Sequence, residues 1–219
     1  MGLRELKKEQ TRQLIAGTAW QLFADRGFDR VTVAEVARAA QVAPATVFNY
    51  FPTKEDLFFF RLDAFGARLV EAIGDRPAGE PALVAFERYV LQTGGLLGRL
   101  EAGEPEALDR LRTVQRMIAA SPALQAREQR ALDAYADSLA ALLAAETAAP
   151  ADDLGARAAA NALVGVQRTL IAYVRRRVLA NEPDGLPEDV RRLGRRAFAL
   201  LAEGLGDYAP KPARPAATP

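Results

Sequence analysis

The stretch VAPATVFNYFPTKEDL, residues 42–57, is the most informative part of this sequence, because it contains several helix stop and start signals close together. Pro44 suits the first position of a helix, where its missing N–H costs nothing, and Pro52 ends the helix that Pro44 begins. Thr53 and Asp56 have the spacing of a capping box. The stretch therefore predicts a short helix between the two prolines and a long helix after the second.

A second set of signals lies upstream of this stretch. Apolar residues at helical spacing predict a first helix from Lys7 to Arg26, which Gly27 ends. Thr32 and Glu35 form another capping box, which opens a second short helix. Two short helices joined by a tight turn form a helix-turn-helix, and the second of them can enter the major groove of DNA. The residues expected to face inward are Val36, Ala37, Val42, Val47 and Phe51.

The outward face of the helix that starts at Pro44 is expected to carry side chains that are small or able to hydrogen-bond. They are Ala43, Pro44, Ala45, Thr46 and Asn49. Such a face allows close approach to base edges, since bulky side chains would hold the backbone away. We therefore expect Thr46 and Asn49 to face bases. On the pattern alone, a helical hairpin with a polar exposed face is an equal alternative.

A longer segment, LIAGTAWQLFADRGFDRVTVAEVARAAQVAPATVFNYFPTKEDL at residues 14–57, resembles the N-terminal DNA-binding domain of the TetR family of transcriptional regulators. The shared patterns are the F-x-x-x-G-F helix end, the T-V-x-x-V-A second helix and the T-x-F-x-Y-F-x-x-K-E-x-L close. The resemblance implies a homodimer that binds a double-stranded, palindromic DNA operator and responds to a small-molecule effector.

The same resemblance implies contacts with the DNA backbone. The N-terminus of the second helix, at Thr32, would face a phosphate, as helix dipoles favour, and Lys54 would bind another. Two residues depart from the family's pattern, because Ala43 stands where serine is frequent and Phe48 where tyrosine is frequent. Phenylalanine cannot donate to a phosphate, so we assign that role to the hydroxyl of Tyr50.

The composition of the whole chain restricts its chemistry. Of 219 residues, 50% are hydrophobic and 26% are charged, with a net charge of +1, as in ordinary globular proteins. Because cysteine and histidine are both absent, the common zinc sites and the Ser-His-Asp arrangement cannot be built, and we expect no cofactor. No signal peptide or membrane-spanning run is apparent, which predicts a cytoplasmic protein without a membrane partner.

Beyond residue 57 the pattern is helical throughout, and no strand is predicted. Further helices are expected at about 82–100, 105–119, 122–147, 152–181 and 187–207, which makes about nine in all. The predicted fold is all-α. Its predicted domains are a helix-turn-helix domain over 1–56, a larger helical bundle for ligand binding and dimerisation over 57–208, and a disordered proline-rich tail over 209–219.

Three glycines in TGGLLG, residues 93–98, are better explained as a weak point within the helix expected over 82–100 than as a nucleotide-binding loop. Thr93 replaces the first glycine of such a loop, and no strand precedes it.

The helix expected over 152–181 has two different faces. Gln167 lies within an apolar stripe, and a buried amide requires a partner, either a ligand or another helix. We place an effector cavity in the C-terminal domain, lined by Phe65, Phe86, Tyr89, Gln115, Tyr135 and Gln167. The opposite face carries small residues that allow close helix packing: Ala158, Ala162, Gly165, Thr169 and Ala172. This face and the final helix, with Leu193, Ala197, Leu201 and Leu205 in register, predict a four-helix dimer interface.

The C-terminal region also resembles, diffusely, actinobacterial TetR regulators that bind acyl-CoA-like ligands. We therefore rank long, partly apolar metabolites first among effectors and cationic drugs second. The leading hypothesis is a repressor released from its operator by such a ligand. An effector-independent or architectural DNA-binding protein is the alternative. An all-helical enzyme is a third hypothesis, with Glu101, Glu104 and Glu106 as its carboxylates, although loop charges explain these residues better.

Two runs of arginine lie near the C-terminal end of the chain, over 175–177 and 191–196. A second nucleic-acid surface would use such a cluster, but solvated helix faces explain it better.

Overall fold

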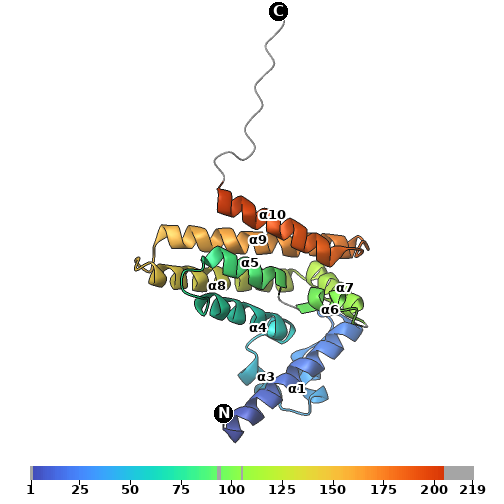
Figure 1. Cartoon of the computed structure of the whole chain (residues 1–219). Helices are drawn as coiled ribbons and strands as arrows, with labels where there is room; N and C mark the ends of the chain where they lie inside the picture. The colour runs from blue at the N-terminus through green and yellow to red at the C-terminus, as the bar shows by residue number, and fades with distance from the viewer. Residues whose placement is uncertain (1, 93–94, 105, 205–219) are drawn as a thin grey trace, which may run out of the picture.

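The computed structural model describes residues 2–92, 95–104 and 106–204, and these residues form ten α-helices and no strand, which confirms the all-α prediction. The helices are α1 (Leu3–Arg26), α2 (Val33–Ala39), α3 (Pro44–Tyr50), α4 (Lys54–Gly74), α5 (Ala82–Gln92), α6 (Gly95–Glu101), α7 (Ala107–Ala120), α8 (Pro122–Glu146), α9 (Leu154–Leu179) and α10 (Leu186–Glu203). In Figure 1, α1, α2 and α3 form a small lower unit beneath a larger body that contains α8, α9 and α10.

The structure has one helix more than the sequence predicted in its described part. The helix expected over 82–100 is two helices, because α5 ends at Gln92 and α6 begins at Gly95. Residues 93–94, which lie between the two helices, are outside the described residues. The predicted tail over 209–219 and Leu205 lie outside the described residues.

Both predicted capping boxes are present. The hydroxyl of Thr32 accepts a hydrogen bond from the Glu35 N–H at 3.2 Å, and the Thr32 N–H donates to the Glu35 carboxylate at 2.8 Å. Thr53 and Asp56 form the same reciprocal pair at the start of α4, at 3.2 and 3.0 Å. α2, α3 and α4 therefore begin at the residues that the sequence predicted.

The hydrophobic core of the lower unit extends beyond the predicted boundary at residue 56. Val36, Ala37, Val47 and Phe51 are buried in it as expected, while Val42 is only partly buried against it. The same core also contains apolar residues from the first turns of α4 and from the α7–α8 corner, namely Leu57, Phe58, Phe59, Val114, Met117, Ile118 and Leu124. The predicted boundary at residue 56 therefore does not separate two cores, because residues on both sides of it pack in the same hydrophobic cluster.

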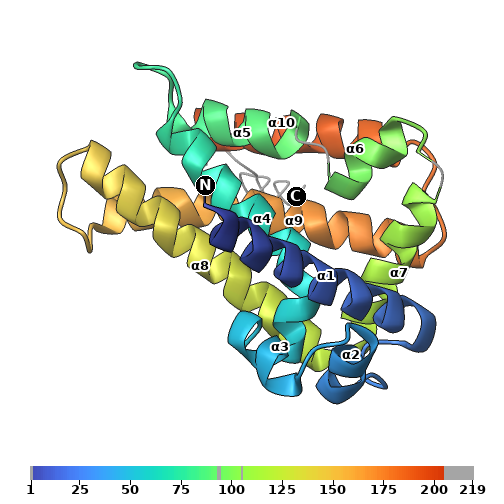
Figure 2. The same cartoon turned by 90° about the horizontal axis from the view of Figure 1, so that it is seen from below.

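The three consecutive phenylalanines at the start of α4 pack on different partners. The ring of Phe58 lies 6.0 Å from that of Trp20 in α1, whereas the guanidinium of Arg127 in α8 lies over the ring of Phe59. Phe60 meets Phe51 edge-on. Consecutive helical residues point about 100° apart, so α4 packs on both sides. Figure 2 shows α4 between α1 and the upper helices.

The core of the upper body is a second cluster, contributed mainly by α4, α5, α8, α9 and α10. Phe86 of α5 and Phe198 of α10 are fully buried there, with ring centroids 5.9 Å apart. Gly194 lets α10 approach α5 closely, because a Cβ at Gly194 would lie 2.5 Å from the side chain of Leu91 in α5. The buried stripe of α10 is Leu186, Val190, Gly194 and Phe198, and the predicted stripe of Leu193, Ala197 and Leu201 is half-buried beside it.

Candidate nucleic-acid interface and effector sites

The exposed face of α3 differs in one respect from the sequence prediction. Pro44, Ala45 and Asn49 are exposed as expected, and so is the capping position Ala43. Thr46, however, is half-buried. Phe48 shares the exposed face instead, with 51% of its surface exposed, because residues four apart lie on the same side of a helix.

Two polar side chains at the end of α3 are available to an external partner. Among the described residues, none forms a hydrogen bond with the side chain of Asn49 or with the hydroxyl of Tyr50. Asn49 is exposed, and Tyr50 is half-buried against the core of the lower unit. An exposed amide can bind bidentately to adenine, and a tyrosine hydroxyl can donate to a phosphate.

The N-terminus of α2 is fixed by a charged cap. Glu35 accepts hydrogen bonds from the Thr32 backbone and from Arg26, whose Nη2 lies 2.7 Å from its carboxylate. These contacts, led by the Thr32 N–H, lower the pKa of Glu35 to about 2. The Thr32 and Glu35 N–H groups are both satisfied within this cap, so Thr32 has a structural role whether or not a phosphate approaches it.

The ammonium of Lys54, which is half-buried, has contacts within the lower unit. Its Nζ donates to the carbonyl oxygens of Phe28 at 3.0 Å and Val31 at 3.1 Å, and it lies 4.1 Å from the centre of the Phe28 ring. These contacts tie the start of α4 to the loop between α1 and α2. Two of the three N–H groups of Lys54 thus have internal partners, and a contact between the third and a phosphate stays a prediction.

Two further contacts attach the lower unit to the α7–α8 corner. The buried hydroxyl of Ser121 donates to Asp29 at 3.1 Å. Asp56 uses one carboxylate oxygen for the Thr53 cap and accepts a hydrogen bond from Arg127 of α8 on the other, at 2.9 Å. Despite partial burial, the hydrogen bonds from Thr53 and Arg127 keep the pKa of Asp56 below its usual value. A movement of α8 would therefore reach the first turn of α4 directly.

Phe65, Tyr89, Tyr135 and Gln167, four of the six predicted effector residues, lie on α4, α5, α8 and α9. The rings of Phe65 and Tyr89 meet edge-on at 5.2 Å, and burial raises the pKa of Tyr89. The ring of Tyr135 lies directly against the backbone of Gly66, where a Cβ would be 2.0 Å from it. Gln167 is 6% exposed, and its Oε1 has no hydrogen-bond partner among the described residues.

The other two predicted effector residues have internal partners. Gln115 accepts a hydrogen bond from the Nε of Arg175 at 2.9 Å, and Arg175 also forms a two-pronged ion pair with Glu128 at 2.7 and 2.8 Å. Phe86 packs against Phe198 in the core. Arg175 thus joins α9 to Gln115 of α7 and to Glu128 of α8, and no sequence pattern indicated this partner for Gln115, sixty residues away.

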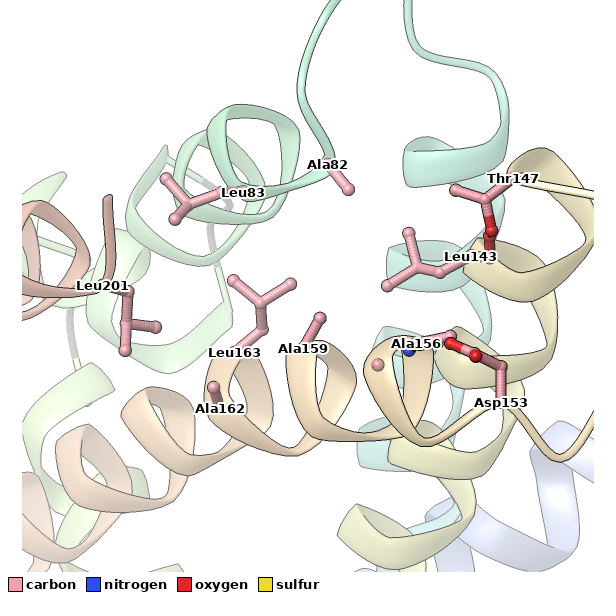
Figure 3. Close-up of a pocket in the computed structure, with 11 residues that line it drawn as sticks. Ala82, Leu83, Leu143, Thr147, Asp153, Ala156, Ala159, Ala162, Leu163 and Leu201 are labelled. Carbon is pink, nitrogen blue, oxygen red and sulfur yellow. Dashed lines mark hydrogen bonds between the residues drawn. The ribbon is translucent and has the colours of Figure 1, made fainter. Parts of the chain in front are cut away.

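A groove of about 500 Å³ lies at the N-terminal end of α9, and the sequence did not predict it. In Figure 3, α9 forms its floor, with Leu83 of α5, Leu143 of α8 and Leu201 of α10 around it. Its lining is aliphatic except for Thr147 and Asp153, and none of the six predicted effector residues lines it. Asp153 caps α9 by accepting from the Ala156 N–H at 2.7 Å.

Most of the arginine cluster forms ion pairs within the upper body. Arg177 pairs with Asp189, and Arg191 pairs with Glu101 of α6. Arg195 and Arg196 remain exposed. The other carboxylates considered for catalysis also pair with arginines, Glu104 with Arg99 and Glu106 with Arg110, so they form no carboxylate pair.

Within the described residues, no group of histidine, cysteine, aspartate and glutamate could hold a metal ion. No helix in that part of the chain is long and apolar enough to span a membrane.

Comparison with known proteins matches both parts of the chain. Residues 15–59 match the family described as bacterial regulatory proteins, tetR family, and residues 95–206 match the family described as the MftR C-terminal domain. The HTH-type transcriptional regulator TcmR of Streptomyces glaucescens is 31% identical over 154 residues, which are 69% of this chain and 67% of that protein.

Solved structures support the architecture. FadR of Thermus thermophilus, a TetR family repressor in complex with lauroyl-CoA, superposes with a TM-score of 0.53 at 23% identity, over 95% of this chain and 98% of FadR. NalD of Pseudomonas aeruginosa, the secondary repressor of the MexAB-OprM multidrug efflux pump, gives a TM-score of 0.54 at 19% identity, over 88% of this chain and 96% of NalD. At these identities the likeness shows the fold alone.

Proposed function

The chain belongs to the TetR family, so it is a DNA-binding transcriptional regulator rather than an enzyme, and we propose that it is a homodimeric repressor released from its operator by a small molecule. The observation that carries the DNA-binding part is the α2–α3 unit. α2, which begins with a capping box, and α3, which begins at Pro44, rest on the buried core of the lower unit, and the outer face of α3 presents the unpartnered amide of Asn49.

We propose that Asn49 contacts a base edge and that Tyr50 holds a phosphate. Asn49→Ala should lower affinity for the operator by about 1–3 kcal/mol per lost base contact and barely change binding to random DNA. The measurement is fluorescence anisotropy with a duplex that the protein selects from a random pool, at several salt concentrations. If random duplex loses as much affinity as the operator, Asn49 contacts the backbone.

The dimer is proposed to form through the small-residue face of α9 together with α10. Ala158, Ala162, Thr169 and Ala172 are exposed in the single chain, and a Cβ at Gly165 would meet no atom within 4 Å. Gly165→Leu therefore fits the single chain but would hold a second copy away. A dimer would place two α3 helices on two half-sites, which is the reason to expect a palindromic operator.

Gly17 provides a matched control for the dimer, because it is also a half-buried helical glycine with open space at its Cβ. We expect Gly165→Leu to be monomeric at micromolar concentration by sedimentation velocity, with unchanged helicity, and Gly17→Leu to stay dimeric. A wild-type chain that sediments as a monomer would refute the proposed dimer.

The effector part of the proposal rests on Gln167. A buried acceptor without a partner costs about 1–3 kcal/mol, and a ligand that donates a hydrogen bond would remove that cost. Phe65, Tyr89 and Tyr135 provide apolar surface on α4, α5 and α8. The FadR structure contains lauroyl-CoA, and we propose a long, partly apolar metabolite of that kind as the effector of this chain. We also propose that the regulator acts in the cytoplasm.

Two variants decide where the effector binds. Gln167→Leu removes the amide at nearly constant volume, whereas Ala82→Phe fills the groove of Figure 3 from α5. Lauroyl-CoA and other acyl-CoAs are added to the operator complex, and release is followed by anisotropy. We expect Gln167→Leu to lose the response and Ala82→Phe to keep it. The opposite result would move the effector to the groove, and no release in wild type would favour an effector-independent regulator.

A further inference from the structure

Phe48 is the one phenylalanine of ten whose side chain is exposed. The other nine are buried or half-buried, most of them in the two cores. Phe48 has no aromatic neighbour among the described ring contacts, and it is outside the core of the lower unit. A side chain that would contribute strongly to stability if buried is therefore kept in solvent, in the middle of the face that α3 presents outward.

The neighbours of Phe48 on α3 restrict what the ring can meet. Ala45 lies one turn before it and Asn49 lies beside it, and both are exposed. The ring has no donor or acceptor, so it forms no hydrogen bond with a phosphate or a base edge. In the major groove, the apolar group that base pairs offer is the C5-methyl of thymine, and phenylalanine is among the side chains that contact it.

We infer that Phe48 reads a thymine methyl group in each half-site of the operator. With Asn49 beside it, α3 would select a thymine next to an adenine, because an amide pairs bidentately with adenine. This inference rests on the proposed DNA-binding function. It makes Phe48 a specificity-determining residue, whereas the sequence pattern showed only the loss of a phosphate-binding hydroxyl.

Replacing thymine by deoxyuridine tests the inference directly, because it deletes the methyl and leaves the hydrogen-bonding edge intact. The full-length wild-type chain first selects an operator from a random duplex pool. Each thymine of that operator is then changed to uracil in both half-sites. We expect one position to respond, with a loss of about fourfold per half-site and about 16-fold for both.

Two variants assign that response to Phe48. Phe48→Ala should bind the original and the uracil operator equally, and a lower salt concentration keeps its affinity measurable, since phosphate contacts strengthen there. Leu14→Ala is the matched control, because Leu14 is 55% exposed but lies on α1. It should keep the full response to uracil. Both variants should unfold at the wild-type temperature.

The inference is overturned if no thymine of the wild-type operator responds to uracil, or if Phe48→Ala retains the response. It is also overturned if folded Phe48→Ala binds no duplex at any salt concentration, because the ring would then be needed for docking rather than for one methyl. The proposed function fails in a different way, namely if the wild-type chain enriches no sequence from the pool.

Discussion

The α2–α3 unit and the layer of α8, α9 and α10 are both helical, but contacts of different range hold their helices in place. In the lower unit, the caps join residues three apart, such as Thr32 to Glu35. In the upper body, ion pairs join residues far apart in the chain, such as Arg76 to Glu146 and Arg175 to Glu128. Local contacts fix where a helix begins, whereas distant contacts fix which helices meet.

The α7–α8 corner contacts both the lower unit and the upper body. Leu124 and Ile118 are buried in the core of the lower unit, while Glu128, one turn further along α8, pairs with Arg175 of α9. Between these residues, Arg127 reaches Asp56 at the first turn of α4. The upper body therefore contacts the lower unit through side chains of α8. Long-range ion pairs within the upper body hold α8 in place.

Removing a long-range contact should have the largest effect on stability. Arg175→Met leaves Glu128 and Gln115 without their partner at a mostly buried position, where side-chain exposures are 21% for Arg175 and 14% for Glu128. Hydrogen bonds to charged groups contribute about 1.5–3 kcal/mol, so we expect the free energy of unfolding to fall by about 3 kcal/mol. Urea denaturation measures it. Arg176→Met, exposed on the same turn, should change it by less than about 0.5 kcal/mol.

Adding a methyl group where two helices are in close contact should have the next largest effect on stability. At Gly66, the added methyl of alanine would overlap the Tyr135 ring, so Gly66→Ala should cost about 2 kcal/mol through overpacking. Gly17→Ala places the same methyl in open space and should instead stabilise the protein by up to about 1 kcal/mol. Thermal denaturation of the two variants gives the comparison. Equal shifts in one direction would show that helix propensity, rather than packing, governs both sites.

A local cap should matter less than either long-range contact. Thr32→Ala removes the hydroxyl that accepts the Glu35 N–H, and loss of such a cap costs about 1 kcal/mol. The same urea experiment applies. A loss larger than that of Arg175→Met would contradict the difference between the two regions.

The smallest expected effect is a dependence on pH. The pKa of Glu35 and that of Asp189 are both lowered to about 2, the first mainly by the Thr32 N–H and the second mainly by Arg192. A carboxyl group whose pKa is lowered by folding stabilises the protein at pH values above the pKa that the group has in the unfolded chain. This contribution is lost as the pH falls from about 4.5 towards 2. Glu35→Gln and Asp189→Asn should each flatten the decline in stability over this range, as measured by urea denaturation at several pH values. An unchanged slope would mean that these carboxylates titrate normally.

Several features were readable from the sequence because their causes are local. The limits of α2 and α3 follow from Thr32, Pro44 and Pro52, whose effects act within one helical turn. The two-sided packing of α4 follows from three consecutive phenylalanines, since helix geometry separates their directions. Most of the proposed DNA-reading face is exposed for the same reason, although Thr46 is half-buried and Phe48 is exposed in addition.

The partners of residues far apart in the chain are visible only in the folded structure. The family resemblance implied a phosphate for Lys54, and the fold shows in addition that two carbonyl oxygens of the α1–α2 loop lie at its ammonium. The sequence placed Gln115 in a cavity, yet α9 supplies Arg175 to it. No spacing along the chain encodes such pairs, because a helical pattern gives the face on which a residue lies but not the helix that will cover that face. Which faces are covered depends on how all the helices pack at once, and that packing leaves Phe48 in solvent and Gln167 buried without a partner.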